Sequence, residues 1–196
     1  MLKLEARTHF ILAKNLYEYF EKRKLKLSKF WLIIGSLKPD FISDDINHYK
    51  DKSISIFYKK YNKLTKTSPE KKIKEFAREL GELFHYIADF FCFAHNDQKM
   101  KNNYSLHFKY EWQLNKFAYK TDKAYKIKIN PADLEILKFT LPEIIEYRHK
   151  NYLQRKQNFK KDLSSSFKTS ILLTNKLLRE ISSKNKKREY ILPEAK

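Results

Sequence analysis

Histidine and carboxylate side chains recur along this chain in an order that suits metal ligands. Five of the six histidines stand near an aspartate or a glutamate. Imidazole nitrogen and carboxylate oxygen are among the atoms that hold zinc in catalytic sites. The pattern therefore predicts a multi-metal site. Its candidate ligands are His9, Asp40, His48, His85, Asp89, His95, His107 and Glu111.

The densest part of this pattern is the segment 81–95, GELFHYIADFFCFAH, which is otherwise mostly apolar. His85 and Asp89 lie four residues apart there, and in a helix such residues differ by roughly 40° in direction and one turn in height. Both side chains can then ligate one ion. Spacing alone leaves a second interpretation equally open, in which the two form a paired couple in the core, because a buried charge needs a partner.

A second pair with the same spacing, His107 and Glu111, follows on the next expected helix. His95 stands between the two pairs and is expected to serve a different ion from His85. An antiparallel return of the chain would bring His107 and Glu111 alongside His95. These three side chains would form a His, His, Glu set with a position left for water, as in catalytic zinc sites.

The remaining candidate ligands complete the expected site. Asp40 stands at the end of an expected helix, where it can turn inward, and with His48 it is available to the ion at His85. His9 can add a further ion that Asp89 bridges. Closely spaced ions suit phosphodiester hydrolysis, because they activate water and neutralise both the attacked group and the leaving oxygen.

The charge of the chain bears on its partners. The 196 residues include 42 Lys and Arg against 23 Asp and Glu, which gives a net charge of +19. Such a charge attracts nucleic acid, an anionic membrane surface or a phosphorylated substrate. An equally weighted alternative is a solvated basic face in a Lys-rich composition of AT-rich origin. The charge indicates no protein partner.

Glycine and cysteine contents exclude several classes of protein. Two glycines exclude glycine-rich phosphate loops and dinucleotide-binding fingerprints. The one cysteine, Cys92, excludes an intramolecular disulfide, and its neighbours Phe91 and Phe93 favour a core position. We see no secretory leader and no run of about 18 apolar residues. We therefore expect a cytoplasmic protein.

Hydrophobic periodicity is mostly helical, which predicts an all-α, single-domain multi-helix bundle over residues 1–183 and a flexible tail over 184–196. Gly35 and Pro39 are expected to end the second helix. Residues 43–68 are expected to form a loop or short helices, and 57–63, FYKKYNK, a solvated loop or a binder of phosphate backbones. His149 is expected at the surface. The expected helices cover 7–23, 30–37, 68–91, 103–119, a short stretch from 130, 142–161 and 167–181.

The order of these residues resembles the zinc-dependent phospholipase C family, which is related to nucleases of the S1/P1 type. The resemblance spans about residues 8 to 112, and its most specific part is HxxxD followed by a histidine six residues later. It implies the all-helical fold of that family. The residues that carry it are Thr8 and His9, the segment 35–40 (GSLKPD), His48, the segment 81–95, His107, and Tyr110 with Glu111.

The resemblance also implies three zinc ions and a role for each candidate. Asp40 would be a ligand of the first ion and would also act as the catalytic base. Phe41 would line the pocket for a substrate headgroup. Secreted members complete the third site with an N-terminal tryptophan, whereas the tryptophans here are Trp31 and Trp112. Two zinc sites are therefore well supplied and the third is incomplete. The first ion would take Asp40, His48, His85 and Asp89; the second His95, His107 and Glu111; the third His9 and the shared Asp89.

The function implied is that of a zinc-dependent phosphoric diester hydrolase of phospholipase C type, in which a metal-bound hydroxide attacks phosphorus. Its partner would be a phospholipid or another phosphodiester. Two alternatives stay open on the residues alone. One is a nuclease of the S1/P1 type, which the basic charge favours, and the other is a non-catalytic protein stabilised by zinc.

Overall fold

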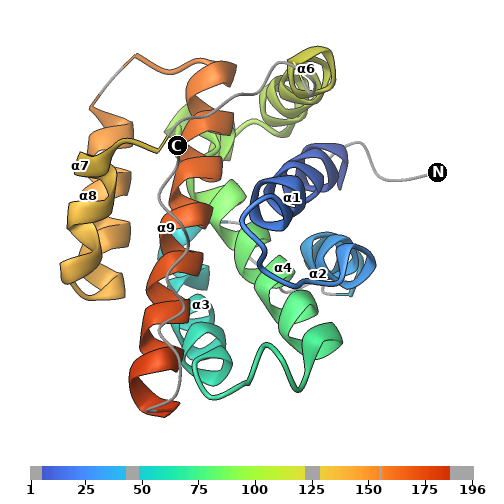
Figure 1. The fold of residues 1–196 in the computed structure, drawn as a ribbon. Helices are drawn as coiled ribbons and strands as arrows, with labels where there is room; N and C mark the ends of the chain where they lie inside the picture. The colour runs from blue at the N-terminus through green and yellow to red at the C-terminus, as the bar shows by residue number, and fades with distance from the viewer. Residues whose placement is uncertain (1–5, 43–48, 122–128, 155, 186–196) are drawn as a thin grey trace.

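A computed structural model describes residues 6–42, 49–121, 129–154 and 156–185. Within these ranges the chain forms nine α-helices and two 3-10 helices, and no strand. This confirms the predicted all-α fold (Figure 1). The elements are α1 (Ala6–Glu21), α2 (Lys29–Ile42), α3 (Lys50–Leu64), α4 (Ile73–Phe90), η1 (Phe93–His95), α5 (Gln98–Lys101), α6 (Tyr104–Thr121), α7 (Pro131–Glu135), η3 (Ile136–Lys138), α8 (Leu141–Leu153) and α9 (Phe159–Asn185).

Helix α4 is the central element of the bundle. It packs against α1, α2, α3 and α9, and α6 lies alongside α1 (Figure 1). From Phe76 to Phe90 every residue except Arg78 is buried, because the helix is covered on all sides. A helix that is covered all round can place polar side chains such as His85 only where partners meet them.

The two glycines of the chain lie where α2 crosses α4. A Cβ atom on Gly35 would lie 1.9 Å from the carbonyl oxygen of Arg78, and one on Gly81 would lie 2.1 Å from that of Leu32. Only glycine allows two helix backbones to approach this closely. The crossing places Asp40, which follows shortly after Gly35, beside α4 and its candidate ligands.

The predicted end of the second helix was wrong, because α2 continues through Gly35 and Pro39 to Ile42. Gly35 serves the crossing with α4 and does not end the helix. Pro39 falls in the last turn, where it removes a single backbone hydrogen bond. Packing against α4 outweighs that local cost.

Residues 43–68 were expected to form a loop or short helices, but their described part contains one helix of 15 residues, α3. Its buried face repeats every three or four residues, with Ser53, Phe57, Tyr61 and Leu64 facing the core. Lysines between these positions mask the helical repeat of the buried residues in the sequence. The segment 57–63 is therefore helical. Two of its three aromatic residues, Phe57 and Tyr61, are buried rather than presented to a nucleic acid, and Tyr58 is partly buried.

Three expected helix boundaries were misplaced. Helix α4 begins at Ile73, because the residues from Ser68 form a turn in which Lys72 N–H donates to the Ser68 carbonyl at 3.1 Å. Helix α8 ends at Leu153, and α9 already begins at Phe159. The serines of 164–166 lie inside α9, where hydroxyls bond to the preceding turn, as Ser166 does to the Asp162 carbonyl at 2.8 Å. Helix α9 also includes residues 184 and 185 of the expected tail, whose remainder, 186–196, lies outside the described residues.

Other expectations agree with the structure. Helices α1 and α6 match the predicted 7–23 and 103–119 within a few residues. Asn130 and Asp133 form a capping box at α7. Cys92 is buried, as expected of a core cysteine, and burial raises the pKa of its thiol. Among the described residues, no helix combines the length and the apolar character needed to cross a membrane.

His149, expected at the surface, is instead buried. Its charged neighbours Arg148 and Lys150 point about 100° away from it around α8, so they do not keep His149 in solvent. Its Nε2 donates to the side-chain oxygen of Asn96 at 2.8 Å. Burial, with the positive charge of Lys50, lowers the pKa of His149 to about 4.

This burial predicts a loss of stability in acid. The unfolded chain binds a proton at His149 below pH about 6.5, whereas the folded chain does so only near pH 4. Between these values, we expect His149 to lower the free energy of unfolding by about 3 kcal/mol as the pH falls. Urea titrations from pH 7 to pH 4 should show a smaller decline for His149→Gln than for the wild type. Parallel declines would show that His149 does not titrate in this way.

Candidate metal centre

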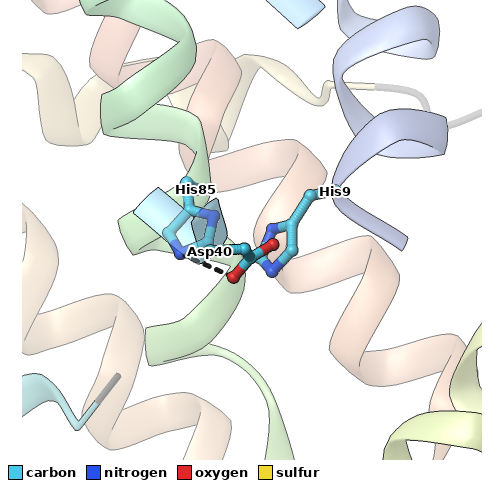
Figure 2. A group of neighbouring side chains, drawn as sticks. All are labelled: His9, Asp40 and His85. Carbon is cyan, nitrogen blue, oxygen red and sulfur yellow. Dashed lines mark ion pairs between the residues drawn. The ribbon is translucent and has the colours of Figure 1, made fainter. Parts of the chain in front are cut away.

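The first cluster of candidate ligands joins three helices. His9 comes from α1, Asp40 from α2, and His85 and Asp89 from α4. His85 Nε2 lies 3.2 Å from Asp89 Oδ2 and 3.7 Å from Asp40 Oδ1, and His9 Nε2 lies 3.4 Å from Asp89 Oδ1. The side chain of Asp89 thus contacts both histidines. Figure 2 shows His9, Asp40 and His85 converging from their separate helices.

Each of these separations fits two ligands of one ion. Ligand atoms of tetrahedral zinc, with bonds of about 2.0–2.1 Å, lie about 3.3 Å from one another. The three nitrogen-to-oxygen distances, 3.2, 3.4 and 3.7 Å, are close to that value. His9, Asp40 and His85 offer donor atoms that all lie within 4.8 Å of one another. The donor set and its geometry suit zinc.

A backbone contact orients the imidazole of His85, and a second contact fixes the backbone of His9. His85 Nδ1 lies 3.0 Å from the carbonyl oxygen of Ser36 on α2. A carbonyl only accepts, so the imidazole carries its proton on Nδ1 and turns the lone pair of Nε2 toward the carboxylates. The hydroxyl of Ser36 donates to the His9 carbonyl at 3.3 Å and so ties α1 to α2. Metal-binding histidines are commonly oriented in this way.

The second cluster comprises His95 on η1 with His107 and Glu111 on α6. Glu111 Oε1 lies 2.9 Å from His95 Nε2 and 3.1 Å from His107 Nε2. Burial alone would raise the pKa of Glu111, but hydrogen bonds from His107 and His95 outweigh it and bring the pKa to about 2. The carboxylate is therefore ionised at neutral pH. The expected antiparallel return is present, although α4 ends at Phe90 and His95 follows on a separate 3-10 turn.

The two clusters are adjacent. A cavity of about 30 Å³ is lined by His9 and Asp89 of the first cluster and by His95 and Glu111 of the second. Cys92 lines the same cavity, and its sulfur lies within 4.8 Å of donor atoms of His95 and Glu111. Groups from both clusters can thus act on one small ligand.

Two polar side chains that the sequence analysis missed, the buried Asp162 and the half-buried Asn96, hold the turn between Asp89 and His95. Asp162 of α9 accepts from Phe93 N–H at 3.2 Å and from the hydroxyls of Tyr110 and Tyr152 at 2.7 and 2.8 Å. Asn96 donates to the carbonyls of Phe90 and Cys92 at 3.0 and 2.7 Å. No local pattern marks Asp162, because Phe93 and Tyr110 are far from it in the sequence. Asn96 lies only a few residues from the two carbonyls that it binds, whereas its third partner, His149, is distant.

Asp162 also has a perturbed acidity. Its burial raises the pKa to about 6, against the lowering effect of hydrogen bonds from Tyr110, Phe93 N–H and Tyr152. The carboxylate is thus mostly ionised at neutral pH, and it accepts three donors. It positions η1, and with it His95, against Glu111.

We expect Asp162→Asn to weaken the second cluster without dismantling the fold, because the amide retains one acceptor oxygen but presents an NH2 group to donors. Zinc affinity or turnover should fall about 10- to 100-fold, the usual effect of changing a group that orients a metal ligand. Asp133→Asn is the matched control, since Asp133 pairs with Arg148 and Lys168 outside the centre. Equal zinc affinity and turnover in both variants would contradict the positioning role.

Two predicted features of the site remain without a structural outcome. His48 lies outside the described residues. Phe41 stands on the last turn of α2, directly after Asp40, and its side chain is 51% exposed. Its proposed contact with a headgroup therefore stays a prediction.

The helical bundle brings histidines and carboxylates together in two adjacent clusters. The protein therefore belongs among all-helical proteins with a candidate multi-metal centre. A comparison with protein families agrees in detail: the family described as zinc dependent phospholipase C matches residues 8–180. The chain therefore belongs to the zinc-dependent phospholipase C family. The match extends beyond the resemblance over residues 8 to 112 and includes most of α9. Searches of the curated proteins and of the solved structures found no match.

Proposed function

We propose that this protein is a zinc-dependent phospholipase C that hydrolyses the phosphodiester of a phospholipid. The observation that carries the proposal is the placement of Asp89, whose two carboxylate oxygens face His9 and His85 at 3.4 and 3.2 Å. A carboxylate shared in this way can bridge two ions. Membership of the family supports the same activity.

Each candidate ligand has a proposed place. Zinc, when bound, lowers the pKa of a coordinated water and draws charge from phosphoryl oxygens. We assign two ions, and a third that His9 and Asp89 would share. Asp40 would both hold the first ion and accept the proton of the attacking water. The first ion takes Asp40, His48, His85 and Asp89, and the second takes His95, His107 and Glu111.

The arrangement of these side chains supports a hydrolytic role. Glu111 is ionised and holds His95 and His107 in fixed orientations. His85 is held in one tautomer by the Ser36 carbonyl. Such rigid placement keeps the ligand set from reorganising during a reaction. Preorganisation of this kind is the main source of electrostatic catalysis.

A nuclease is the second candidate, because the net charge of +19 favours a polyanionic substrate. The two are separated by assaying the zinc-loaded protein with phosphatidylcholine, an anionic phospholipid, single-stranded DNA and bis(p-nitrophenyl) phosphate. We expect the protein to release diacylglycerol from a phospholipid. The Asp40→Asn variant should lose this activity, and the Asp133→Asn variant should keep it. Cleavage of DNA with no lipid hydrolysis would favour the nuclease, and no turnover of any substrate would favour a binding protein.

A further inference from the structure

A groove between α1 and α6 lies outside the two clusters. It encloses about 640 Å³, and its walls carry four cationic side chains, Arg7 and Lys14 from α1 and Lys116 and Lys120 from α6. Of the residues that line it in the described part of the chain, none is acidic. The groove is therefore suited to a ligand or a surface that carries several negative charges.

Aromatic side chains accompany these cations. Phe10, Trp112 and Tyr119 line the groove. Tyr104 and Phe108 extend the exposed aromatic row toward the start of α6, and Tyr104 and Tyr119 are 78% and 80% exposed. Steps of four, four and seven residues keep Tyr104, Phe108, Trp112 and Tyr119 on one face of the helix. Exposed aromatic residues interleaved with lysines are typical of helices that lie in a membrane interface.

The groove adjoins the candidate metal centre. Asn115 lines both the groove and the small cavity between the two clusters. The hydroxyl of Thr8, the neighbour of His9, donates to the Asn115 side chain. Helix α6 also carries His107 and Glu111. A surface that docks on this face would thus come close to the metal centre.

We infer that the α1–α6 face docks on a bilayer of anionic phospholipids. The four cations complement such a surface, and the aromatic rings match its boundary between headgroups and acyl chains. A single-stranded nucleic acid fits less well, because the Lys116 ammonium lies 3.3 Å from the centre of the Trp112 ring and covers a face on which a base would stack. Tyr104 and Phe108 are likewise stacked on each other, at 6.5 Å between ring centres.

This inference rests on the proposed lipid substrate, so binding and turnover are measured separately. Lys116→Glu combined with Lys120→Glu reverses two charges of the groove and touches none of the candidate ligands. The control pair is Lys71→Glu with Lys74→Glu, which makes the same change of net charge at exposed positions beside the start of α4. Thermal melts establish that both proteins are folded.

Co-sedimentation with phosphatidylglycerol and phosphatidylcholine vesicles tests the docking. We expect the groove variant to bind anionic vesicles at least about tenfold more weakly than the wild type, and the control to stay within about twofold. Turnover of soluble bis(p-nitrophenyl) phosphate should be unchanged in the groove variant. A wild type that binds no anionic vesicles, or equal binding by both variants, would overturn the docking surface. So would a variant that loses binding to single-stranded DNA and keeps vesicle binding. If the wild type does not turn over soluble bis(p-nitrophenyl) phosphate, the proposed function is refuted instead.

Discussion

Replacing Asp89 with asparagine is expected to lower phosphodiesterase activity by at least about a thousandfold, because it removes charge and one acceptor from the middle of the first cluster. Asp89 faces His85 with one oxygen and His9 with the other, at 3.2 and 3.4 Å. An amide has one oxygen and one NH2 group, so it cannot offer an acceptor to both positions. We expect at least one zinc ion per chain to be lost with the activity.

Zinc content and turnover should be measured on the same preparation of Asp89→Asn. Asp133→Asn, which removes a carboxylate outside the centre, should retain both. An Asp89→Asn protein with the zinc content and turnover of the wild type would show that Asp89 does not bridge ions. Zinc loss with full turnover would separate metal binding from catalysis and would equally contradict the proposal.

Gly81→Ala is expected to cause a large loss of stability. The added Cβ would lie 2.1 Å from the Leu32 carbonyl oxygen and 2.8 Å from the Ser36 nitrogen, both of which are backbone atoms. Helices α2 and α4 must then separate, and we expect the free energy of unfolding to fall by about 3 kcal/mol. In a domain of this size, the melting temperature should fall by about 6–12 °C.

The same displacement would move Ser36 and Asp40 away from His85, so Gly81→Ala should also bind less zinc. Calorimetry of the metal-free protein isolates the packing effect from that of bound metal. Ser55→Ala adds an alanine at an exposed position of α3 and should leave the melting temperature within about 2 °C. If Gly81→Ala melts with this control, the close crossing of α2 and α4 does not limit stability.

The sequence predicted those parts of the fold in which hydrophobic spacing is undisturbed. Helix α4, apart from its start, and helices α1 and α6 fall into this group. Helix α3 was not predicted as one continuous helix because lysines between its buried positions mask the helical period, and the end of α2 was misplaced because packing at Gly35 overrides local propensity. The start of α9 was misplaced because serine hydroxyls are satisfied inside a helix. Of these cases, the end of α2 depends on a tertiary contact, which local sequence does not record.

The candidate site was accessible from sequence because its ligands recur at helical spacing. His85 with Asp89 and His107 with Glu111 each lie on one helix, and the carboxylate residue of each pair lines one cavity. Asp162 could not be found in this way, since its partners Phe93 and Tyr110 are more than 50 residues away. The α1–α6 groove likewise arises only when two helices distant in sequence lie side by side.

Metal content is the most direct test of the central claim that these clusters hold zinc. The purified protein, exchanged into metal-free buffer, should be analysed for all transition metals by mass spectrometry. We predict at least two zinc ions per chain, with one fewer in Asp89→Asn. A folded wild-type protein that retains no zinc and takes up none from solution would contradict the account.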